Sequence, residues 1–147
     1  MRLSRNVRLR ACPGCAKKPE RSKALEVVRP AVESLSEMTG ALSESMDNLA
    51  AIDKQILVER HLISREHAAK GAGSGLVLNK EETRFVMINE EDHLRMQALR
   101  PGLQLKQAWL AIDRIDTELE KKLDYAFSNE LGYLTACPTN LGTGIRV

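Results

Sequence analysis

Two long stretches of the chain repeat their apolar residues at the spacing of an α-helix. The first covers residues 19–38, and Pro30 inside it predicts a kink or a break into two helices. The second covers residues 103–123 and is the longest such pattern in the chain. Its expected buried face consists of Leu105, Trp109, Ile112, Ile115, Leu119 and Leu123. The face opposite carries mainly charges, Asp116 among them, so this helix is expected to pack across a sheet.

A third helical pattern covers residues 46–60, between these two. Gly40 separates it from the first helix, and Ser43 or Ser45 is a candidate N-cap. We interpret its apolar face, which includes Ile52 and Ile56, as core and not as a surface for a partner. Residues 61–64 end the helix.

Short β-prone runs make up much of the remaining chain. Residues 76–79 and 83–88 predict a hairpin, which a glycine-rich linker at 70–75 joins to the preceding helix. Residues 131–137 and 142–147 predict two further strands. Together these elements predict an α+β fold, an antiparallel β-sheet flanked by helices, that is incomplete and leaves an exposed edge at the end of the chain.

Composition limits the function classes only broadly. The 147 residues, 43% of them hydrophobic and 3% aromatic, suit one globular domain with a modest core. A net charge of +2, without a basic stripe interleaved with aromatics, gives no sign of nucleic-acid binding. No apolar stretch approaches the roughly 20 residues that span a bilayer. We therefore expect a cytoplasmic protein that binds neither nucleic acid nor membrane.

Three cysteines, Cys12, Cys15 and Cys137, make an odd number, which argues against a disulfide framework. A zinc site needs about four ligands, and the single Cys-x-x-Cys pair has no second pair to complete it. We interpret Cys12 and Cys15 as incidental reduced thiols and expect no protein-bound metal.

The chemistry of the chain is concentrated in residues 89–95, Asn-Glu-Glu-Asp-His-Leu-Arg. They follow the β-prone run 84–88 and precede a pattern that we interpret as helical. Three acids and an arginine at the end of a strand are unfavourable if buried without partners. Either these residues neutralise each other on the surface or they bind a charged ligand. A helical turn at this point would bring Glu91 and Arg95, four residues apart, toward one cleft.

This stretch, together with Cys137-Pro-Thr-Asn-Leu-Gly-Thr143, resembles the paired signatures of the guanidino kinases, the ATP:guanido phosphotransferases. The resemblance extends over nearly the whole chain. Residues 60–64, 100–105 and 123–127 resemble the bacterial protein-arginine kinase branch in particular. The resemblance implies transfer of the γ-phosphoryl group of ATP to a guanidinium nitrogen, with Mg²⁺ held by the phosphates.

The resemblance also implies roles for individual residues. Glu91 and Cys137 match the catalytic carboxylate and the reactive cysteine that grip the guanidinium group from two sides. The residues that match nucleotide ligands are Arg2, His61, Arg95 and Arg146. Those that match the surroundings of the substrate are Glu90, Asp92 and Asn140. For His61 a capping or packing role at the helix end is an equal alternative.

Three departures from the family pattern leave alternatives open. Only Arg2 remains of the phosphate-binding opening, and the chain stops after Arg146-Val147, so residues 1–147 are expected to be part of a catalytic domain. Cys12 and Cys15 replace aromatic residues common in that branch. The expected partners are ATP and arginine side chains of proteins, a proteolysis-linked regulator among them. A kinase of small guanidino compounds and a catalytically inactive remnant are the alternatives.

Overall fold

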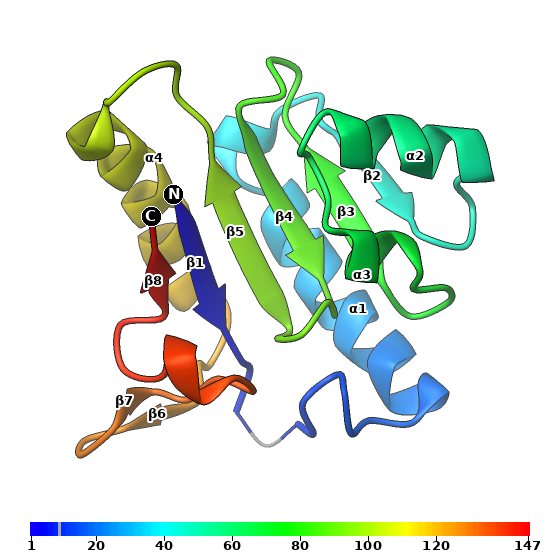
Figure 1. The fold of residues 1–147 in the computed structure, drawn as a ribbon. Helices are drawn as coiled ribbons and strands as arrows, with labels where there is room; N and C mark the ends of the chain where they lie inside the picture. The colour runs from blue at the N-terminus through cyan, green and yellow to red at the C-terminus, as the bar shows by residue number, and fades with distance from the viewer. Residues whose placement is uncertain (9) are drawn as a thin grey trace.

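A computed structural model describes residues 1–8 and 10–147 as one six-stranded antiparallel sheet with helices on both faces (Figure 1). The strands of this sheet are β1 (Arg2–Arg5), β2 (Leu42–Ser45), β3 (Gly75–Leu78), β4 (Arg84–Ile88), β5 (Leu94–Ala98) and β8 (Ile145–Arg146). Their order across the sheet is β2-β3-β4-β5-β1-β8. The other elements are α1 (Lys18–Glu33), η1 (Ser36–Met38), α2 (Ala51–Glu59), α3 (Arg65–Ala68), α4 (Leu105–Glu120), η2 (Pro138–Asn140) and a small hairpin of β6 (Phe127–Ser128) and β7 (Gly132–Tyr133). The predicted α+β class is confirmed.

The strands β1, β3, β4 and β5 bury alternate side chains against α1 and α4, which lie behind the sheet in Figure 1. In β5 the buried positions Leu94 and Met96 alternate with the half-buried Arg95 and Gln97. The largest core cluster joins this face to the two helices. It includes Leu3, Val28, Val32, Val77, Val86, Ile88, Leu94, Met96, Ile112, Ile115 and Leu119.

The opposite face of the sheet is covered over only part of its width. Helix α2 buries Leu57 against Leu76, Phe85 and Met87 of β3 and β4, in a second and smaller cluster. Figure 1 shows α2 and α3 in front of β3 and β4, whereas no described helix lies in front of β5, β1 and β8 on this side. The polar half of these three strands is therefore left facing outward.

The stretch with the three acids is the turn of a β-hairpin, so the expectation of a helix after it is wrong. Ile88 of β4 pairs with Leu94 of β5, and the backbone N–H of Asn89 donates to the carbonyl of His93 at 3.0 Å. Asn89 adopts the left-handed conformation (φ 58°), which asparagine tolerates better than most residues. The period-two alternation of β5 was the sequence signal for a strand. The expected hairpin of β3 and β4 is confirmed.

Helix α2 is shorter than the expected 46–60, because residues 46–50 form a turn after the edge strand β2. Ser43 and Ser45 lie in β2 and pair with β3, so neither caps the helix, which begins at Ala51. Ile52 is 61% exposed and Ile56 is 47% exposed. The expectation that the apolar face of this helix is entirely core is therefore wrong.

The two long helices agree with the expected ranges but not in every detail. Pro30 does not divide α1, which continues to Glu33. In α4, Leu105 and Trp109 are exposed at the N-terminal end, whereas Asp116 is buried. The expected burial of the first two residues and exposure of the third are therefore wrong.

The C-terminal strands are shorter than the sequence indicates. Within residues 131–137 only β7 is a strand, and within 142–147 only β8 is. β8 adds to the sheet beside β1, with Arg146 opposite Arg2. None of the described helices is both long and apolar enough to cross a membrane.

Candidate functional site

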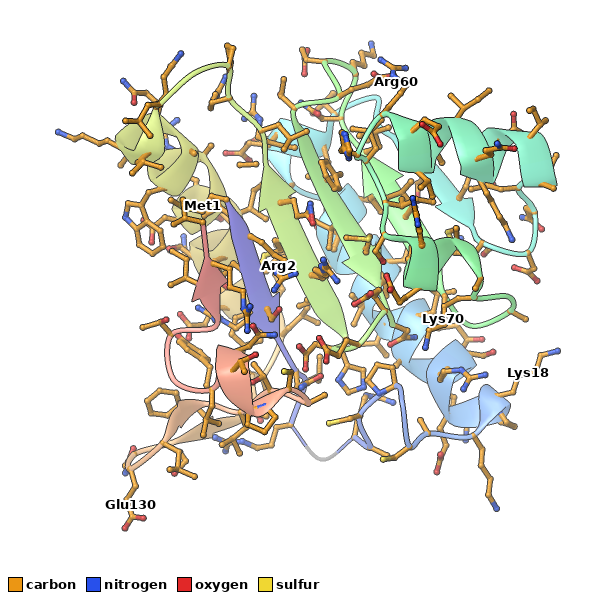
Figure 2. The ribbon with its side chains drawn as sticks, viewed as in Figure 1. Met1, Arg2, Lys18, Arg60, Lys70 and Glu130 are labelled. Carbon is orange, nitrogen blue, oxygen red and sulfur yellow. The ribbon has the colours of Figure 1, made fainter. Side chains whose placement is uncertain are left out.

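Three arginines lie on the uncovered half of the sheet. Residues paired directly across antiparallel strands point to the same face, and Arg2 of β1 is paired with both Gln97 of β5 and Arg146 of β8. Arg95 lies on the same face, two residues before Gln97. Figure 2 shows the Arg2 side chain in front of the sheet, beside β5. A cavity of about 310 Å³, which we call the arginine cavity, is lined by all three arginines.

A second cavity of about 620 Å³ adjoins it and shares Arg2 and Arg95. We call it the turn cavity, because the hairpin turn between β4 and β5 supplies its acidic wall. The residues that line it are Arg2, Cys12, Gly14, Cys15, Glu66, Lys70, Glu90, Glu91, Arg95 and Ala136. Two of the predicted acids and two of the predicted arginines therefore meet in one space.

Glu90 positions Arg95. One Glu90 carboxylate oxygen accepts a hydrogen bond from Ser64 at 2.9 Å and lies 3.0 Å from Arg95 Nη1. The other oxygen accepts the backbone N–H of Glu91 at 2.7 Å. Burial raises the pKa of Glu90, but the charge of Arg95 and these hydrogen bonds outweigh burial and hold the pKa below its usual range. Glu90 is thus an ionised carboxylate, with both oxygens engaged, that holds one nitrogen of the Arg95 guanidinium group.

Glu91 differs from its neighbours in being exposed. Among the residues that the structure describes, its carboxylate has no hydrogen-bond or ion-pair partner. It lines the turn cavity on the same wall as Glu90. Glu91 is therefore the carboxylate in this cavity that is available to a cationic ligand.

Asp92 holds the loop that precedes Cys137. Its Oδ1 accepts hydrogen bonds from Asn6 Nδ2 at 2.6 Å and from the backbone N–H of Ala136 at 2.7 Å. Burial raises the pKa of Asp92, although these two hydrogen bonds act in the opposite direction. The contacts make Asp92 a positioning residue. Its expected contribution to the field on a substrate cation stays a prediction.

Cys137 belongs to a short polar chain that ends at Arg146. Cys137 Sγ lies 2.8 Å from Thr139 Oγ1, which accepts a hydrogen bond from the Arg146 guanidinium group. Arg146 Nε also donates to the buried Asn140 Oδ1 at 2.8 Å. Asn140 and Thr139 therefore orient Arg146. Cys137 does not line the cavity that contains Glu91, so its contact with a substrate guanidinium stays a prediction.

His61 lies away from both cavities. It follows the last turn of α2 in a left-handed conformation (φ 57°), is exposed, and lines neither the turn cavity nor the arginine cavity. The structure does not bring His61 together with the other predicted nucleotide ligands, Arg2, Arg95 and Arg146. Its nucleotide-binding role stays a prediction.

Comparison with known proteins identifies the family of the chain. The sequence model of the ATP:guanido phosphotransferase C-terminal catalytic domain matches residues 23–147. The chain belongs to this family. It is 46% identical over 146 residues to a protein-arginine kinase of Halothermothrix orenii and 44% identical over 149 residues to one of Pelotomaculum thermopropionicum. Each alignment covers 99% of this chain and 42% of the relative. The expected family membership is confirmed.

Solved guanidino kinase structures share the fold. The duplicated taurocyamine kinase from Schistosoma mansoni superposes with a TM-score of 0.89 and 28% identity, covering 97% of this chain and 22% of that one. A lombricine kinase superposes with a TM-score of 0.81 and 26% identity, covering 97% of this chain and 44% of that one. The chain thus has the fold of part of a guanidino kinase catalytic domain.

The arginine cavity is suited to a polyanion such as the phosphates of ATP. Burial, followed by the charges of Arg95 and Arg146, lowers the pKa of Arg2. The buried Nε atoms of Arg2 and Arg95 have no hydrogen-bond partner. Three crowded guanidinium groups with unused donors are stabilised by a multivalent anion. No cluster of three or more potential metal-ligating side chains occurs in the described part of the chain.

Sequence reasoning missed several residues that shape this site. Ser64 caps α3 and also binds Glu90, whereas Thr139 bridges Cys137 and Arg146. Lys70 and Glu66, which follow Ser64 in and after α3, line the turn cavity. The N-cap signal of Ser64 was visible in the sequence. The other contacts depend on which segments the fold places side by side.

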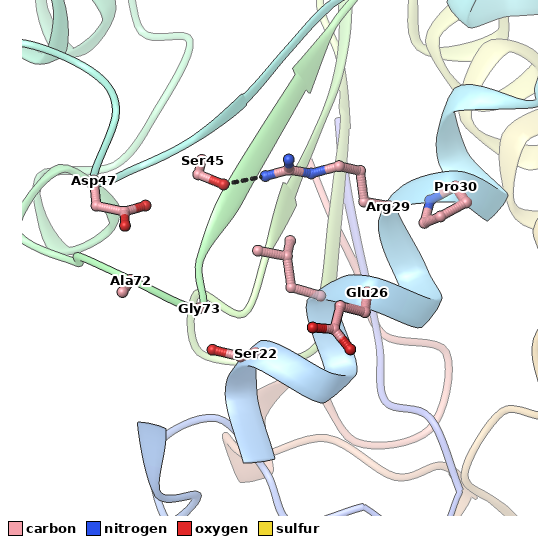
Figure 3. A pocket seen from close by; sticks show the side chains of 9 residues that line it. Ser22, Glu26, Arg29, Pro30, Ser45, Asp47, Ala72 and Gly73 are labelled. Atoms are coloured by element: carbon pink, nitrogen blue, oxygen red, sulfur yellow. Dashed lines mark hydrogen bonds between the residues drawn. The ribbon is translucent and has the colours of Figure 1, made fainter. Parts of the chain in front are cut away.

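Another cavity, of about 490 Å³, lies between α1 and the strand β2 (Figure 3). Arg29 donates to Ser45 Oγ at 2.6 Å across it, with Glu26 and Asp47 on its rim. None of the predicted site residues lines this space.

Proposed function

We propose that the protein to which this chain belongs transfers the γ-phosphoryl group of MgATP to the guanidinium group of arginine side chains in proteins. The observation that carries the proposal is the pairing of an available carboxylate, Glu91, with three arginines around two adjoining cavities that share Arg2 and Arg95. A guanidinium cation suits the turn cavity, and a chain of phosphates suits the arginine cavity.

The guanidinium group needs help from the protein, because its pKa of about 12.5 or higher keeps it protonated and a poor nucleophile. A carboxylate at the position of Glu91 aligns the planar cation and accepts its proton. In this step a guanidinium nitrogen forms a bond to the γ-phosphorus, the bond from that phosphorus to the ADP oxygen breaks, and the nitrogen's proton passes to Glu91. Glu90 keeps Arg95 in place during the transfer.

The transferring phosphoryl group spreads negative charge over its oxygens. Arg2, Arg95 and Arg146 present planar forks that bind such oxygens and stay charged throughout. The contact of Asn140 with Arg146 Nε limits the rotation of that fork. Mg²⁺ held by the phosphates and water would neutralise further charge on the ATP substrate.

Protein arginine is favoured over a small guanidino substrate by the relatives. Proteins named protein-arginine kinase are 38–46% identical to this chain over 99% of its length, whereas the taurocyamine and lombricine kinase structures are 28% and 26% identical. We further propose that the reaction takes place in the cytoplasm, where MgATP is supplied, and that its substrates include a regulator linked to proteolysis.

A second candidate is a non-catalytic remnant that retains part of the pocket. One observation favours it: neither His61 nor Cys137 lines the turn cavity or the arginine cavity. In that case the chain would bind nucleotide weakly and transfer no phosphate.

Incubation with ATP labelled in the γ-phosphoryl group, followed by detection of acid-labile phosphoarginine, separates these possibilities. We expect label on an arginine-rich protein substrate and little on free arginine. Glu91→Gln should lower the rate by about 10²–10⁴-fold, because it removes the proton acceptor. Glu59→Gln, at an exposed position of α2 outside both cavities, is the matched control. Label on free arginine alone would refute the choice of protein substrate, and label on neither would favour the remnant.

A further inference from the structure

Two cysteines lie on one turn between β1 and α1, separated by Pro13 and Gly14. The backbone N–H groups of Cys15 and Ala16 both donate to the Cys12 carbonyl at 2.9 Å, which makes a single helix-like turn. Residues three apart on such a turn have Cβ atoms roughly 5–6 Å apart. A disulfide requires roughly 3.5–4.5 Å. A small adjustment within the turn is therefore enough to join the two sulfurs.

Both cysteines line the turn cavity, which Glu90 and Glu91 also line. Cys15 is exposed, whereas Cys12 is partly buried. Burial, followed by the charge of Asp92 and the neighbouring Cys15, raises the pKa of Cys12. A reagent that arrives from solvent therefore meets Cys15 first, and Cys12 is placed behind it as the second thiol.

We propose that Cys12 and Cys15 form a dithiol site that disulfides of low-molecular-weight thiols modify at the wall of the turn cavity. The Cys15 thiolate attacks one sulfur of such a disulfide, forms a mixed disulfide and releases one thiolate. Cys12 then attacks the Cys15 sulfur, forms the Cys12–Cys15 disulfide and releases the second thiolate. The protein's two thiols are oxidised, the reagent is reduced to two thiols, and those thiols take up the two protons.

The two steps have opposite effects on the cavity. The mixed disulfide adds a substituent at Cys15, beside the space that Glu91 and Arg95 line, and so obstructs it. The second step removes the substituent and leaves a closed turn. A metal is not the ligand inferred here, because a zinc site needs about four ligands and no group of three or more gathers in the described residues.

The test is treatment of the protein with oxidised glutathione, followed by intact-mass measurement, a count of free thiols and peptide mapping. Wild type should lose two of its three free thiols, retain no glutathione, and show a peptide linked through Cys12 and Cys15. Cys12→Ser should retain one glutathione on Cys15, because the second thiol is missing. That adduct should obstruct the turn cavity. A reducing thiol should return both proteins to their original mass and number of free thiols.

Cys137→Ser is the matched control, because it removes the third thiol and leaves the turn unchanged. This variant should still lose two thiols and form the same cross-link. A glutathione adduct that persists in wild type, or a cross-link that includes Cys137, would overturn the proposal. If Cys15→Ser and Cys12→Ser gain glutathione equally, the proposed order of the two steps would be overturned. None of these readouts depends on phosphoryl transfer, so they fail or succeed independently of the proposed kinase activity.

Discussion

Replacing one partner of the Arg5–Asp116 ion pair should destabilise the fold strongly, whereas replacing both partners with apolar residues should change its stability little. Arg5 Nη2 lies 2.7 Å from Asp116 Oδ2, and both side chains are largely buried. Arg5 also donates to the Thr143 carbonyl at 2.8 Å and lies 3.5 Å from the centre of the Tyr133 ring. The pair therefore connects β1 with α4 and with the C-terminal segment.

The magnitudes indicate that burial opposes the attraction. At 2.7 Å and an effective dielectric constant of about 20, the attraction is about 6 kcal/mol. Burial nevertheless raises the pKa of Asp116 despite the charge of Arg5, so desolvation is the larger effect. Removing one partner of such a pair typically destabilises a protein by about 3–5 kcal/mol, whereas replacing both with apolar residues is often neutral. We expect about 3 kcal/mol or more for Arg5→Met and for Asp116→Leu, and about 1 kcal/mol or less for the double variant.

Urea unfolding followed by circular dichroism measures these differences. The raised pKa of Asp116 means that the folded state takes up a proton more readily than the unfolded state, so this stabilisation is present at low pH and is lost as pH rises through the folded pKa. Arg5→Met raises that pKa further, so its deficit should narrow as pH is lowered from 7 toward 5. A double variant as unstable as the sum of the two single variants would refute the reasoning.

Three further predictions follow from single residues. NMR titration should give pKa values of about 4 for His67 and His93, because burial lowers the pKa of each from 6.5. The stability that each neutral histidine contributes should be complete above pH 6.5 and fall by about 2 kcal/mol by pH 5. Measured pKa values near 6.5 would contradict this. Gly144→Ala should destabilise by about 2–4 kcal/mol in urea unfolding, because φ is +70° and the new Cβ would lie 2.5 Å from the Ser4 carbonyl oxygen; Gly71→Ala, with open space around it, should change little. Calorimetric titration with MgATP should show binding about 10–100-fold weaker in Arg95→Ala. The control variant Arg114→Ala, at an exposed position of α4, should bind as the wild type does.

The two long helices α1 and α4 and the hairpin of β3 and β4 were predictable because their patterns are local. Helix α4 repeats apolar residues at the helical period, and β3 and β4 are short unbroken apolar runs of β-prone residues. β1 and β2 gave no such signal, because each has four residues and little apolar character. They become strands through their partners, β1 between β5 and β8 and β2 at the edge of β3. The burial of Asp116 was equally invisible, because its partner Arg5 lies 111 residues away.

The residues of the candidate site were predictable from the sequence motif, but the contacts of each residue were not. The sequence motif pointed to Glu90, Glu91 and Asp92 as one acidic group. The structure separates them: Glu90 is bound to Arg95, Asp92 holds Ala136, and Glu91 is left available. Adjacent residues in a tight turn point in different directions, so three neighbouring carboxylates acquire three different environments.

The position of the arginines follows from the architecture of the sheet. Strand alternation sends Arg2, Arg95 and Arg146 to the face opposite α1 and α4, and α2 and α3 cover only the β3 and β4 part of that face. A helix packed over these arginines would bury three like charges together, which is strongly unfavourable without counterions. In the described structure only Glu90 forms an ion pair with any of them. In the described structure this half of the sheet is left to solvent, and the proposed binding of an anion would supply the missing negative charge.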